Sequence, residues 1–322
     1  MNVSVKPRVE LRPFGGTGRD YEALAAISNA ISQNLTATAE GLKACDRRQD
    51  PNRLLQRFVA EIAGKTVGHG AYRQMGWSPT PEGIFIDVGV HPDHQGRGVG
   101  GALYDHLTAA LSRHEPRFLW ADAREDRRMA VRFLSGRGFE PTMRTVVSRL
   151  DVSGFDAGSF LAGQWTVPGG DIEVCSLDRL MTPVPDWRNR CWDLLWELRQ
   201  DMPHALEPTR QPFDSFIKMF KSPEFTPGAW FIAHDGDDWV GISNIWPDRA
   251  DATLFHTGVT GVVRNYRRRG IATDLKLRAI EFVRAQGGEI IDTSNEESNP
   301  MLALNRALGF KSKPAWISFQ KA

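Results

Sequence analysis

The sequence has few cysteines and no long apolar stretch. Its 322 residues include three cysteines, Cys45, Cys175 and Cys191, and no CxxC pair. This composition argues against a disulfide framework and fits a reducing, cytoplasmic compartment. No segment approaches the ~18 consecutive apolar residues that a membrane-spanning helix needs. The first residues also lack the apolar region of a secretory signal, so we expect neither secretion nor insertion into a membrane.

Net charge and metal-binding patterns are missing too. The formal net charge is +1 and the isoelectric point is about 7.8, so there is no overall electrostatic attraction for nucleic acid or an anionic membrane. The eight histidines form no HExxH motif, and no His/Cys cluster has the spacing of a zinc site. We therefore expect no metal and no nucleic-acid partner.

The predicted secondary structure follows the same order twice. Apolar residues alternate in the expected strands and recur at helical spacing in the expected helices. In the first part of the chain we expect strands at 8–14, 57–64, 66–75, 82–90, 117–123 and 143–152, and helices at 18–33, 99–113 and 126–139. In the second part we expect strands at 171–177, 252–263, 288–293 and 315–320, a hairpin at 229–246, and helices at 186–200, 271–286 and 300–308.

The spacing of matching residues supports a duplication. Gln95 and Arg267 occupy equivalent places 172 residues apart, and Gly138 and Gly309 are 171 residues apart. Matched order and matched spacing predict two copies of one α+β domain. We place the N-terminal half at 1–152, a linker at 153–170 and the C-terminal half at 171–322. Within the Gly-rich linker, "FDAGSFLAG" is expected to hold a short helix.

A glycine-rich loop joins the long strand of the N-terminal half to the next helix, in "HPDHQGRGVGGAL". The N–H groups of such a loop and of the helix N-terminus bind anions, and glycines let a phosphate approach the backbone. A literal GxGxxG is present at Gly96, Gly98 and Gly101. The strand before it follows a hairpin instead of opening a βαβ unit, and the C-terminal half lacks the pattern. A dinucleotide site is therefore the less favoured interpretation.

Both halves share a different pattern, [Gln/Arg]-x-x-Gly-x-[Gly/Ala]. It defines the N-terminal loop, Gln95, Gly96, Arg97, Gly98, Val99 and Gly100, and the C-terminal loop, Arg267, Arg268, Arg269, Gly270, Ile271 and Ala272. With "VGVHPDHQ" before the first loop, and with "MAVRFLSGRGF" and "NPMLALNRALGF" downstream, the chain resembles the GNAT superfamily of acyl-CoA-dependent N-acetyltransferases. The resemblance covers nearly the whole chain, as two copies.

The resemblance implies a fold and a co-substrate. The fold is α+β, with two tandem GNAT-like domains that each have a mixed, mostly antiparallel, splayed sheet flanked by helices. Each loop would cradle the pyrophosphate of acetyl-CoA, and the three consecutive arginines suit its phosphates. The pantetheine would hydrogen-bond to the backbone of the preceding strand, at Val88, Gly89 and Val90 or at Thr260, Gly261 and Val262. Asn299 matches a family asparagine that contacts the co-substrate.

The family's usual acid is missing. A tyrosine normally stands four residues before the glycine of the Gly-Phe pair, where this chain has Leu134 and Asn305. We therefore expect other groups to move protons.

Three residues are our candidates for that role. Asp87 is an unusual charge in "IFIDVGV", with a structural carboxylate as the alternative interpretation, and His256 stands on the corresponding strand, with a packed core histidine as the alternative. Glu297, with its neighbour Glu296, is the third candidate.

The sequence gives the least information about the residues that would bind the acceptor amine. Trp192 and Trp196 stand at i and i+4 on a predicted helix, with carboxylates on a neighbouring face. Tryptophans at this spacing are typical of a core, but in a cleft they would suit a cationic amine. Because tandem relatives such as mycothiol synthase usually rely on their C-terminal copy, we favour that half.

The sequence thus predicts a cytoplasmic N-acetyltransferase that moves the acetyl group of acetyl-CoA to a primary amine of a small molecule by direct attack. We expect a monomer or a homodimer. A peptide or protein N-acetyltransferase, and a catalytically degenerate acyl-CoA-binding regulatory protein, remain open.

Overall fold

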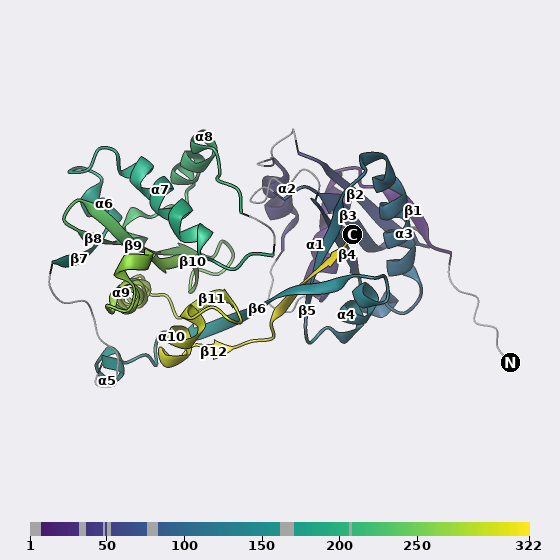
Figure 1. The fold of residues 1–322 in the computed structure, drawn as a ribbon. Coiled ribbons are helices and arrows are strands. Elements are labelled where there is room, and N and C mark those ends of the chain that lie inside the picture. The colour runs from purple at the N-terminus through teal and green to yellow at the C-terminus, as the bar shows by residue number, and fades with distance from the viewer. Residues whose placement is uncertain are drawn as a thin grey trace. The chain divides into compact units, whose positions relative to one another are not determined.

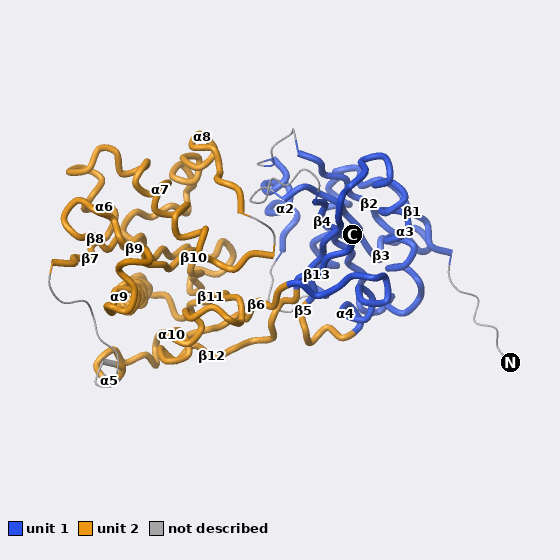
Figure 2. Tube along the Cα trace, viewed as in Figure 1, with its two compact units in different colours: residues 1–123, 129–142, 318–322 blue, residues 124–128, 143–317 orange. Residues whose placement is uncertain are grey.

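A computed structural model describes residues 8–31, 37–47, 49, 53–75, 83–161, 171–205 and 208–322. The chain forms two compact units, shown in different colours in Figure 2. Unit 1 consists of residues 1–123, 129–142 and 318–322, and unit 2 of residues 124–128 and 143–317.

Unit 1 is a sheet with helices packed on it (Figure 1). Its strands run in the order β1-β2-β3-β4-β5-β13, followed by the first residues of β6. The strands are β1 (Glu10–Pro13), β2 (Leu55–Ile62), β3 (Lys65–Arg73), β4 (Gly83–Val90), β5 (Phe118–Arg124) and β13 (Trp316–Lys321). The helices are α1 (Gly18–Ile31), α2 (Ala39–Arg47), α3 (Val99–Leu111) and α4 (Arg128–Ser135).

Unit 2 repeats this plan with the strand order β6-β11-β10-β9-β8-β7, and β12 also pairs with β6. The strands are β6 (Glu140–Asp151), β7 (Ile172–Ser176), β8 (Trp230–Asp235), β9 (Asp238–Pro247), β10 (Leu254–Val262), β11 (Ile290–Glu296) and β12 (Lys311–Ser312). The helices are α5 (Ala157–Leu161), α6 (Leu177–Leu180), α7 (Trp187–Gln200), α8 (Phe213–Phe216), α9 (Ile271–Ala285) and α10 (Met301–Ala307).

The last strand of each half belongs to the unit that the other half builds. Residues 318–322, at the end of the C-terminal half, are part of unit 1, and most of β6, at the end of the N-terminal half, is part of unit 2. In unit 2, β6 runs antiparallel to β11, from the pair Asp151 and Ile290 to the pair Thr145 and Glu296. The predicted boundaries at 1–152 and 171–322 describe the repeat in the sequence, whereas the compact units group residues by contact.

The predicted α+β fold class is confirmed. β4 pairs in parallel with β5, and β10 with β11, whereas the other pairs whose registers are resolved are antiparallel. The structure adds the helices α2, α6 and α8 and the short strand β12, which the sequence pattern did not indicate. The short helix expected in the linker corresponds to α5, and residues 162–170 of the linker lie outside the described residues.

Helices cover both faces of the unit 2 sheet, with α7 on one side of β9 and β10 and α9 on the other (Figure 1). A side chain at Gly241 would meet Ile271 and Leu275 of α9, whereas one at Gly261 would meet Leu198 of α7. Both helices bury their apolar stripes in the core of this unit. The core thus fixes both helices firmly against the strands that carry the C-terminal loop.

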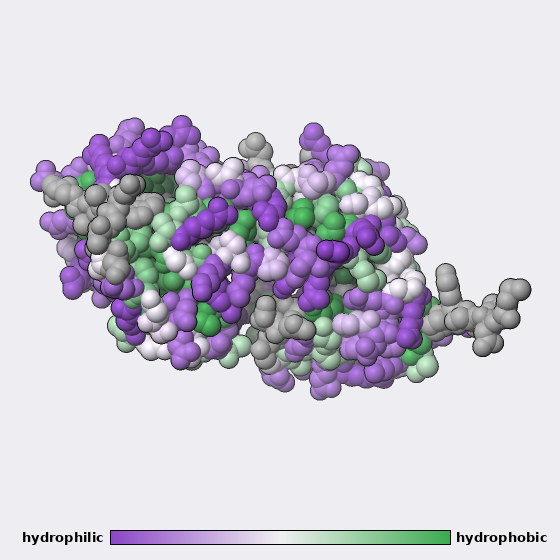
Figure 3. All heavy atoms as spheres, turned by 90° about the horizontal axis from the view of Figure 1, so that it is seen from below, coloured by the Kyte–Doolittle hydropathy of each residue, from purple (hydrophilic) through white to green (hydrophobic). Residues whose placement is uncertain are grey.

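The surface is polar. Hydrophilic residues predominate on the face drawn in Figure 3, with apolar residues in smaller patches between them. Among the described residues, the exposed large hydrophobic side chains are Met129 and Trp316. No helix within the described ranges has the length and apolar character needed to cross a membrane.

Candidate functional site

The two loops share one backbone conformation. A short 3-10 turn precedes each of them, at Pro92–His94 and at Arg264–Tyr266. Gly98 and Gly270 then take left-handed φ angles of 87° and 80° as N-caps of α3 and α9, and neither helix start has a side-chain cap. The N–H groups of each first turn are therefore available to an anion, and the helix dipole favours one there.

The first residue of each loop motif binds the end of its own strand. The Gln95 amide donates to the Val90 carbonyl oxygen at 3.0 Å, and Arg267 Nε donates to the Val262 carbonyl oxygen at 2.9 Å. Arg267 also forms an ion pair with Asp201. This shared position therefore closes the turn from strand to loop in both halves.

The other two arginines of the triplet differ from each other. Arg268 has a φ of 62°, the left-handed conformation that Gly96 adopts at 72° in the N-terminal loop. Arg269 lies over the Tyr266 ring at 4.9 Å and donates to the Asn265 carbonyl oxygen at 3.1 Å. The Arg269 guanidinium thus remains close to the loop, where phosphates would lie.

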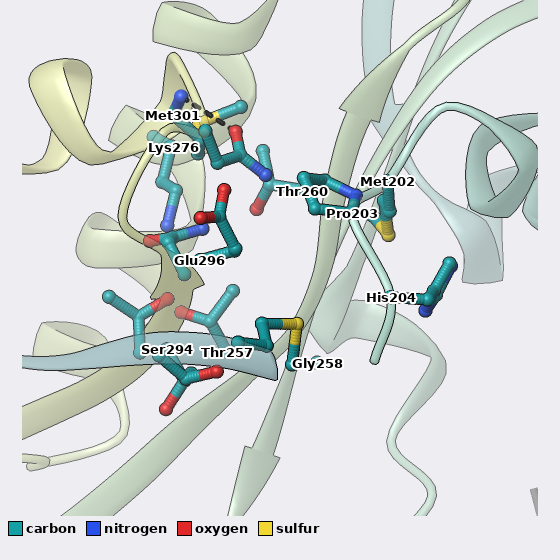
Figure 4. Close-up of a pocket in the computed structure, with 15 residues that line it drawn as sticks. Met202, Pro203, His204, Thr257, Gly258, Thr260, Lys276, Ser294, Glu296 and Met301 are labelled. Carbon is teal, nitrogen blue, oxygen red and sulfur yellow. Dashed lines mark hydrogen bonds between the residues drawn. The ribbon is translucent and has the colours of Figure 1, made fainter. Parts of the chain in front are cut away.

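In unit 2 the two parallel strands separate. β10 and β11 pair with each other from Leu254 and Ile290 to His256 and Asp292. Both strands continue beyond that point, but there no residue of β10 pairs with a residue of β11. A pocket of about 220 Å³ opens where they diverge (Figure 4). Its lining residues are Met143, Thr145, Met202, Pro203, His204, Thr257, Gly258, Thr260, Lys276, Thr293, Ser294, Asn295, Glu296, Asn299 and Met301.

This pocket crosses the plane of the sheet. Lys276 reaches it from α9 on one face, and Met202, Pro203 and His204 come from the segment that follows α7 on the other face. Met143 and Thr145 of β6 also line the pocket, so the last strand of the N-terminal half completes the site of the C-terminal half.

A β-bulge shapes the wall of the pocket. Thr257 is opposite Ile245 and Thr260 is opposite Ser243, so two residues of β10 face one residue of β9. The extra backbone N–H, at Val259, donates to Asn244 Oδ1 at 2.6 Å. The corresponding strand β4 pairs with β3 without any shift from Phe85 to Val90.

The most unusual group in the pocket is the Lys276 amine. The residue is 2% exposed, and its Nζ has no hydrogen-bond partner among the residues that the structure describes. Burial alone lowers the pKa of this amine to about 7. An amine of this kind can both hold and release a proton near neutral pH.

Asn305 stands where the resembled family has its tyrosine. Its side-chain Nδ2 donates to Asn295 Oδ1 at 2.6 Å, and Asn295 lines the same pocket as Lys276. Asn305 is fully buried, and its own Oδ1 lacks a partner within the described part of the chain. An amide cannot replace the proton that a tyrosine would supply.

The two neighbouring glutamates lie in different places. Glu296 lines the pocket, and the Ser298 N–H donates to its Oε2 at 2.9 Å. Glu297 forms an ion pair with Arg144, with Nη1 and Oε2 3.0 Å apart, and does not line the pocket. Asn299, which also lines the pocket, accepts the Met301 N–H at 2.9 Å and so begins α10.

His256 lies on β10 just before the strands diverge, outside the lining of the pocket. Its Nε2 is 2.9 Å from Asp248 Oδ2. Burial raises the pKa of Asp248, but hydrogen bonds from His256 and from two backbone N–H groups outweigh it, and the net pKa is lowered. His256 is therefore paired with a carboxylate beside the site.

The two tryptophans are not in the pocket lining either. Trp192 donates from Nε1 to the Gln211 carbonyl oxygen at 2.8 Å, and the Arg210 guanidinium lies 3.4 Å from the centre of its ring. The ring face that would attract a cationic substrate is thus covered by a cation of the chain itself. Trp196 is partly buried on the same helix.

Asp87 belongs to unit 1, where it lies near the buried His69. Burial lowers the pKa of His69, and the charge of Asp87 opposes that shift. The predicted backbone positions Val88, Gly89 and Val90 all pair with β3, and the His69 ring lies against Gly89 so closely that a Cβ there would collide with it. The predicted residues of the N-terminal half are therefore gathered around β4.

The fold and the paired loops agree with comparisons to known proteins. The chain matches the Acetyltransferase (GNAT) family twice, over residues 25–139 and 190–310, which together make up more than half of its length. The chain therefore belongs to the GNAT family of N-acetyltransferases, as a member with two GNAT regions. This family uses acetyl-CoA.

Particular relatives share the tandem arrangement. The mycothiol acetyltransferase of Frankia casuarinae is 26% identical over 309 residues, which cover 92% of this chain and 82% of that protein. A tandem GNAT protein from the clavulanic acid biosynthesis pathway superimposes with a TM-score of 0.74 at 18% identity, over 98% of each chain. A GCN5-related N-acetyltransferase from Sphaerobacter thermophilus also gives 0.74, at 17% identity, over 97% of this chain and 95% of that one.

Sequence reasoning missed the residues that converge on the pocket from a distance. Lys276 is the clearest example, since it stands on the apolar stripe of α9 with Ala279, Ile280 and Val283, all of them buried. A lysine at such a position is a signal that helical spacing could have revealed. The contribution of β6 had no such signal, because it depends on the exchange of last strands.

Proposed function

We propose that the C-terminal half catalyses transfer of the acetyl group of acetyl-CoA to a primary amine of a small molecule, by direct attack of the amine. The observation that carries this proposal is the pocket where β10 and β11 diverge, which is lined by Lys276 of α9 and by residues 202–204 after α7. The name of the mycothiol acetyltransferase relative supports a small-molecule acceptor.

The residues present fit acetyl-CoA. The C-terminal loop offers uncapped N–H groups and the guanidinium groups of Arg268 and Arg269 for the pyrophosphate. Beyond His256, the edge of β10 that faces β11 is unpaired, so Thr260 and Gly261 are suited to bind the amides of the pantetheine. We place the thioester in the pocket, between the Lys276 side and the acceptor side.

Glu296 is the best-placed base. It lines the pocket, and Ser298 fixes one of its carboxylate oxygens. In the proposed reaction the amine nitrogen bonds to the carbonyl carbon, its proton passes to Glu296 directly or through water, and the bond between carbonyl carbon and sulfur breaks. Most of the rate gain would come from holding the amine and the thioester together.

Two measurements test the function. Calorimetry should show binding of acetyl-CoA, and release of free thiol should be seen with members of a panel of small primary amines. Turnover on peptides but on none of the small amines would favour a protein N-acetyltransferase. Binding without turnover on any acceptor would favour a regulatory acyl-CoA-binding protein, and absence of binding would refute the proposal.

A matched pair of variants tests the base. Glu296→Gln should lower kcat by roughly 100-fold, since general-base catalysis contributes about that much. Glu297→Gln is the control, because this neighbour is held by Arg144 outside the pocket lining. Equal effects of the two changes on kcat would exclude Glu296 as the base.

A further inference from the structure

Lys276 has a buried amine for which the C-terminal half provides no hydrogen-bond partner among the described residues. The amine is buried at the wall of the pocket, and none of the described residues hydrogen-bonds to it. Its nearest aromatic neighbour is Phe310, with Nζ 5.3 Å from the centre of the ring. An amine left unpaired in a protein interior costs stability, so such a group indicates a ligand or a chemical role.

At the equivalent position of the N-terminal half, the polar end of the side chain has a hydrogen-bond partner. Tyr104 is the sixth residue of α3, as Lys276 is of α9. The Tyr104 ring packs on Phe139, which matches Phe310, and its hydroxyl lies 3.3 Å from Lys321 Nζ. The polar tip has a partner in the N-terminal half, whereas in the C-terminal half it borders an open pocket.

The missing tyrosine leaves one proton unaccounted for. Attack on the thioester produces a thiolate, and Asn305, at the position of the family's tyrosine, cannot protonate it. Asn305 is connected to the pocket through Asn295, and Lys276 lines that same pocket (Figure 4). Lys276 is thus the proton donor in the pocket that is closest to the function of the absent hydroxyl.

We propose that Lys276 is a catalytic residue that donates a proton to the sulfur of coenzyme A as the thioester breaks. This inference rests on the acetyl transfer proposed above. The bond between amine nitrogen and carbonyl carbon forms, the carbon–sulfur bond breaks, and its electron pair goes to sulfur, which takes a proton from the Lys276 ammonium. The proton that Glu296 accepted from the amine returns to Lys276 through water, which restores both groups.

The elements around the pocket carry other titratable and charged groups, whose effects on a pH profile have to be separated from that of Lys276. Those on the elements that pack around the pocket are Asp274 and Arg278 of α9, Asp292 and Glu296 of β11, Arg149 of β6, Arg306 of α10, His256 of β10, and His204 after α7. Arg278 forms an ion pair with Asp274 and Arg149 with Asp292, and His256 is hydrogen-bonded to Asp248. Glu296 and His204 line the same pocket as Lys276. A pH dependence of kcat can therefore be assigned to Lys276 only by comparison with a variant that lacks this amine.

A titration tests the contact with sulfur without any acceptor. Protein labelled with ¹³C at the lysine Cε atoms is followed by NMR as free protein, with coenzyme A, and with desulfo-coenzyme A, and Lys276→Met identifies the signal. Lys276 should titrate near pH 7 in the free protein, and at least about one unit higher with coenzyme A than with the desulfo compound, because only the former offers a thiolate. Exposed Lys311 is the internal control. Identical Lys276 titrations with both compounds would overturn the proposal.

Kinetics test the proton transfer itself. Lys276→Met should lower kcat by roughly 100-fold and remove the fall of kcat at alkaline pH, while the Kd for acetyl-CoA stays within about threefold. Lys311→Met should behave as the unmodified protein. In Lys276→Met/Asn305→Tyr, a tyrosine at the family position should restore about tenfold of the lost kcat.

The possible failures can be told apart. If the unmodified protein transfers no acetyl group or binds no acetyl-CoA, the proposed function is wrong. If it does transfer, but Lys276→Met retains kcat and the alkaline fall, only the role of Lys276 is wrong. A loss of acetyl-CoA binding in proportion to the loss of kcat would instead make Lys276 a binding residue.

Discussion

The helices that follow the two loops begin alike and then differ at their sixth residue, Tyr104 in α3 and Lys276 in α9. Tyr104 meets the ammonium of Lys321, whereas Lys276 faces the pocket without a partner among the described residues. The strands before the loops differ in the same way. β4 is regular along its pairing with β3, and β10 carries a bulge at the pocket wall.

The two halves share the backbone conformation of the loops and differ in the side chains that follow them. The backbone of the loops is nearly identical, even where Arg268 replaces a glycine, because the anion site depends on N–H groups and on left-handed φ angles. The side chains that follow the loops differ, with Tyr104 in α3 and Lys276 in α9, as expected if only the C-terminal half places proton-transfer groups there. We therefore expect the largest differences between paired variants at residues that face the pocket.

The strongest test changes the N-cap glycine of each loop. Gly270→Glu introduces a carboxylate and a strained left-handed residue at the proposed phosphate site, so the Kd for acetyl-CoA at the catalytic half should rise at least about 100-fold. Gly98→Glu makes the same change in the N-terminal loop and should leave kcat unaltered. Calorimetry and thiol release measure both. Loss of turnover in Gly98→Glu alone would assign catalysis to the N-terminal half.

The second test uses the stability of Lys276→Met. The pKa of Lys276 is lowered on folding to about 7, so in the window from pH 7 to about 10.5 the unfolded chain holds a proton that the folded chain lacks. The free energy of unfolding should therefore rise with pH across this window by about 1.4 kcal/mol per unit from this group. Lys276→Met should be more stable at pH 7 by about 4 kcal/mol.

Urea unfolding at pH 7 and at pH 10 checks this expectation. The gap in stability between Lys276→Met and the unmodified protein should shrink toward pH 10, which is close to the pKa of the lysine amine in the unfolded chain. A gap that does not depend on pH would mean that the amine is charged in the folded protein.

The third test concerns the bulge. A methyl group at Gly258 would collide with the Asn244 side chain, which holds the Val259 N–H. Gly258→Ala should therefore distort the pocket wall and lower kcat about tenfold or more. Gly89→Ala, which would collide with His69, should lower stability without changing kcat. The comparison fails if both variants, assayed at temperatures where they are folded, lose kcat equally.

The smallest effects are expected at the first residue of each loop motif. Gln95→Ala and Arg267→Ala each remove one hydrogen bond to the strand end, which should cost about 1 kcal/mol of stability. Arg267→Ala also breaks the ion pair with Asp201. Arg267→Gln removes the ion pair but keeps a side chain that can donate to the strand end, as Gln95 does, so it separates the two contributions. Thermal unfolding should rank Arg267→Ala below Arg267→Gln, and the opposite order would contradict the shared role.

The sequence by itself determined the repeat, the order of strands and helices and the position of both loops. These features are local, since apolar periodicity, turn residues and loop glycines act over a few residues, and the family followed from them. The helix α2 and the strand β12 were missed because their patterns are short and weak. The roles of the individual site residues remain predictions that the experiments above address.

Only the tertiary structure decided which side chains meet. It placed Glu296 in the pocket and Glu297 against Arg144, although the two residues are consecutive in the sequence. It brought Met143 and Thr145 of β6 to the site of the other half, because the halves exchange their last strands. The sequence shows Lys276 only as a charged residue on a helix. The structure shows that it lines the pocket where β10 and β11 diverge. Helical spacing places Lys276 on the apolar stripe of α9, but the extent of its burial, which sets the pKa of the amine, arises from packing across the whole unit.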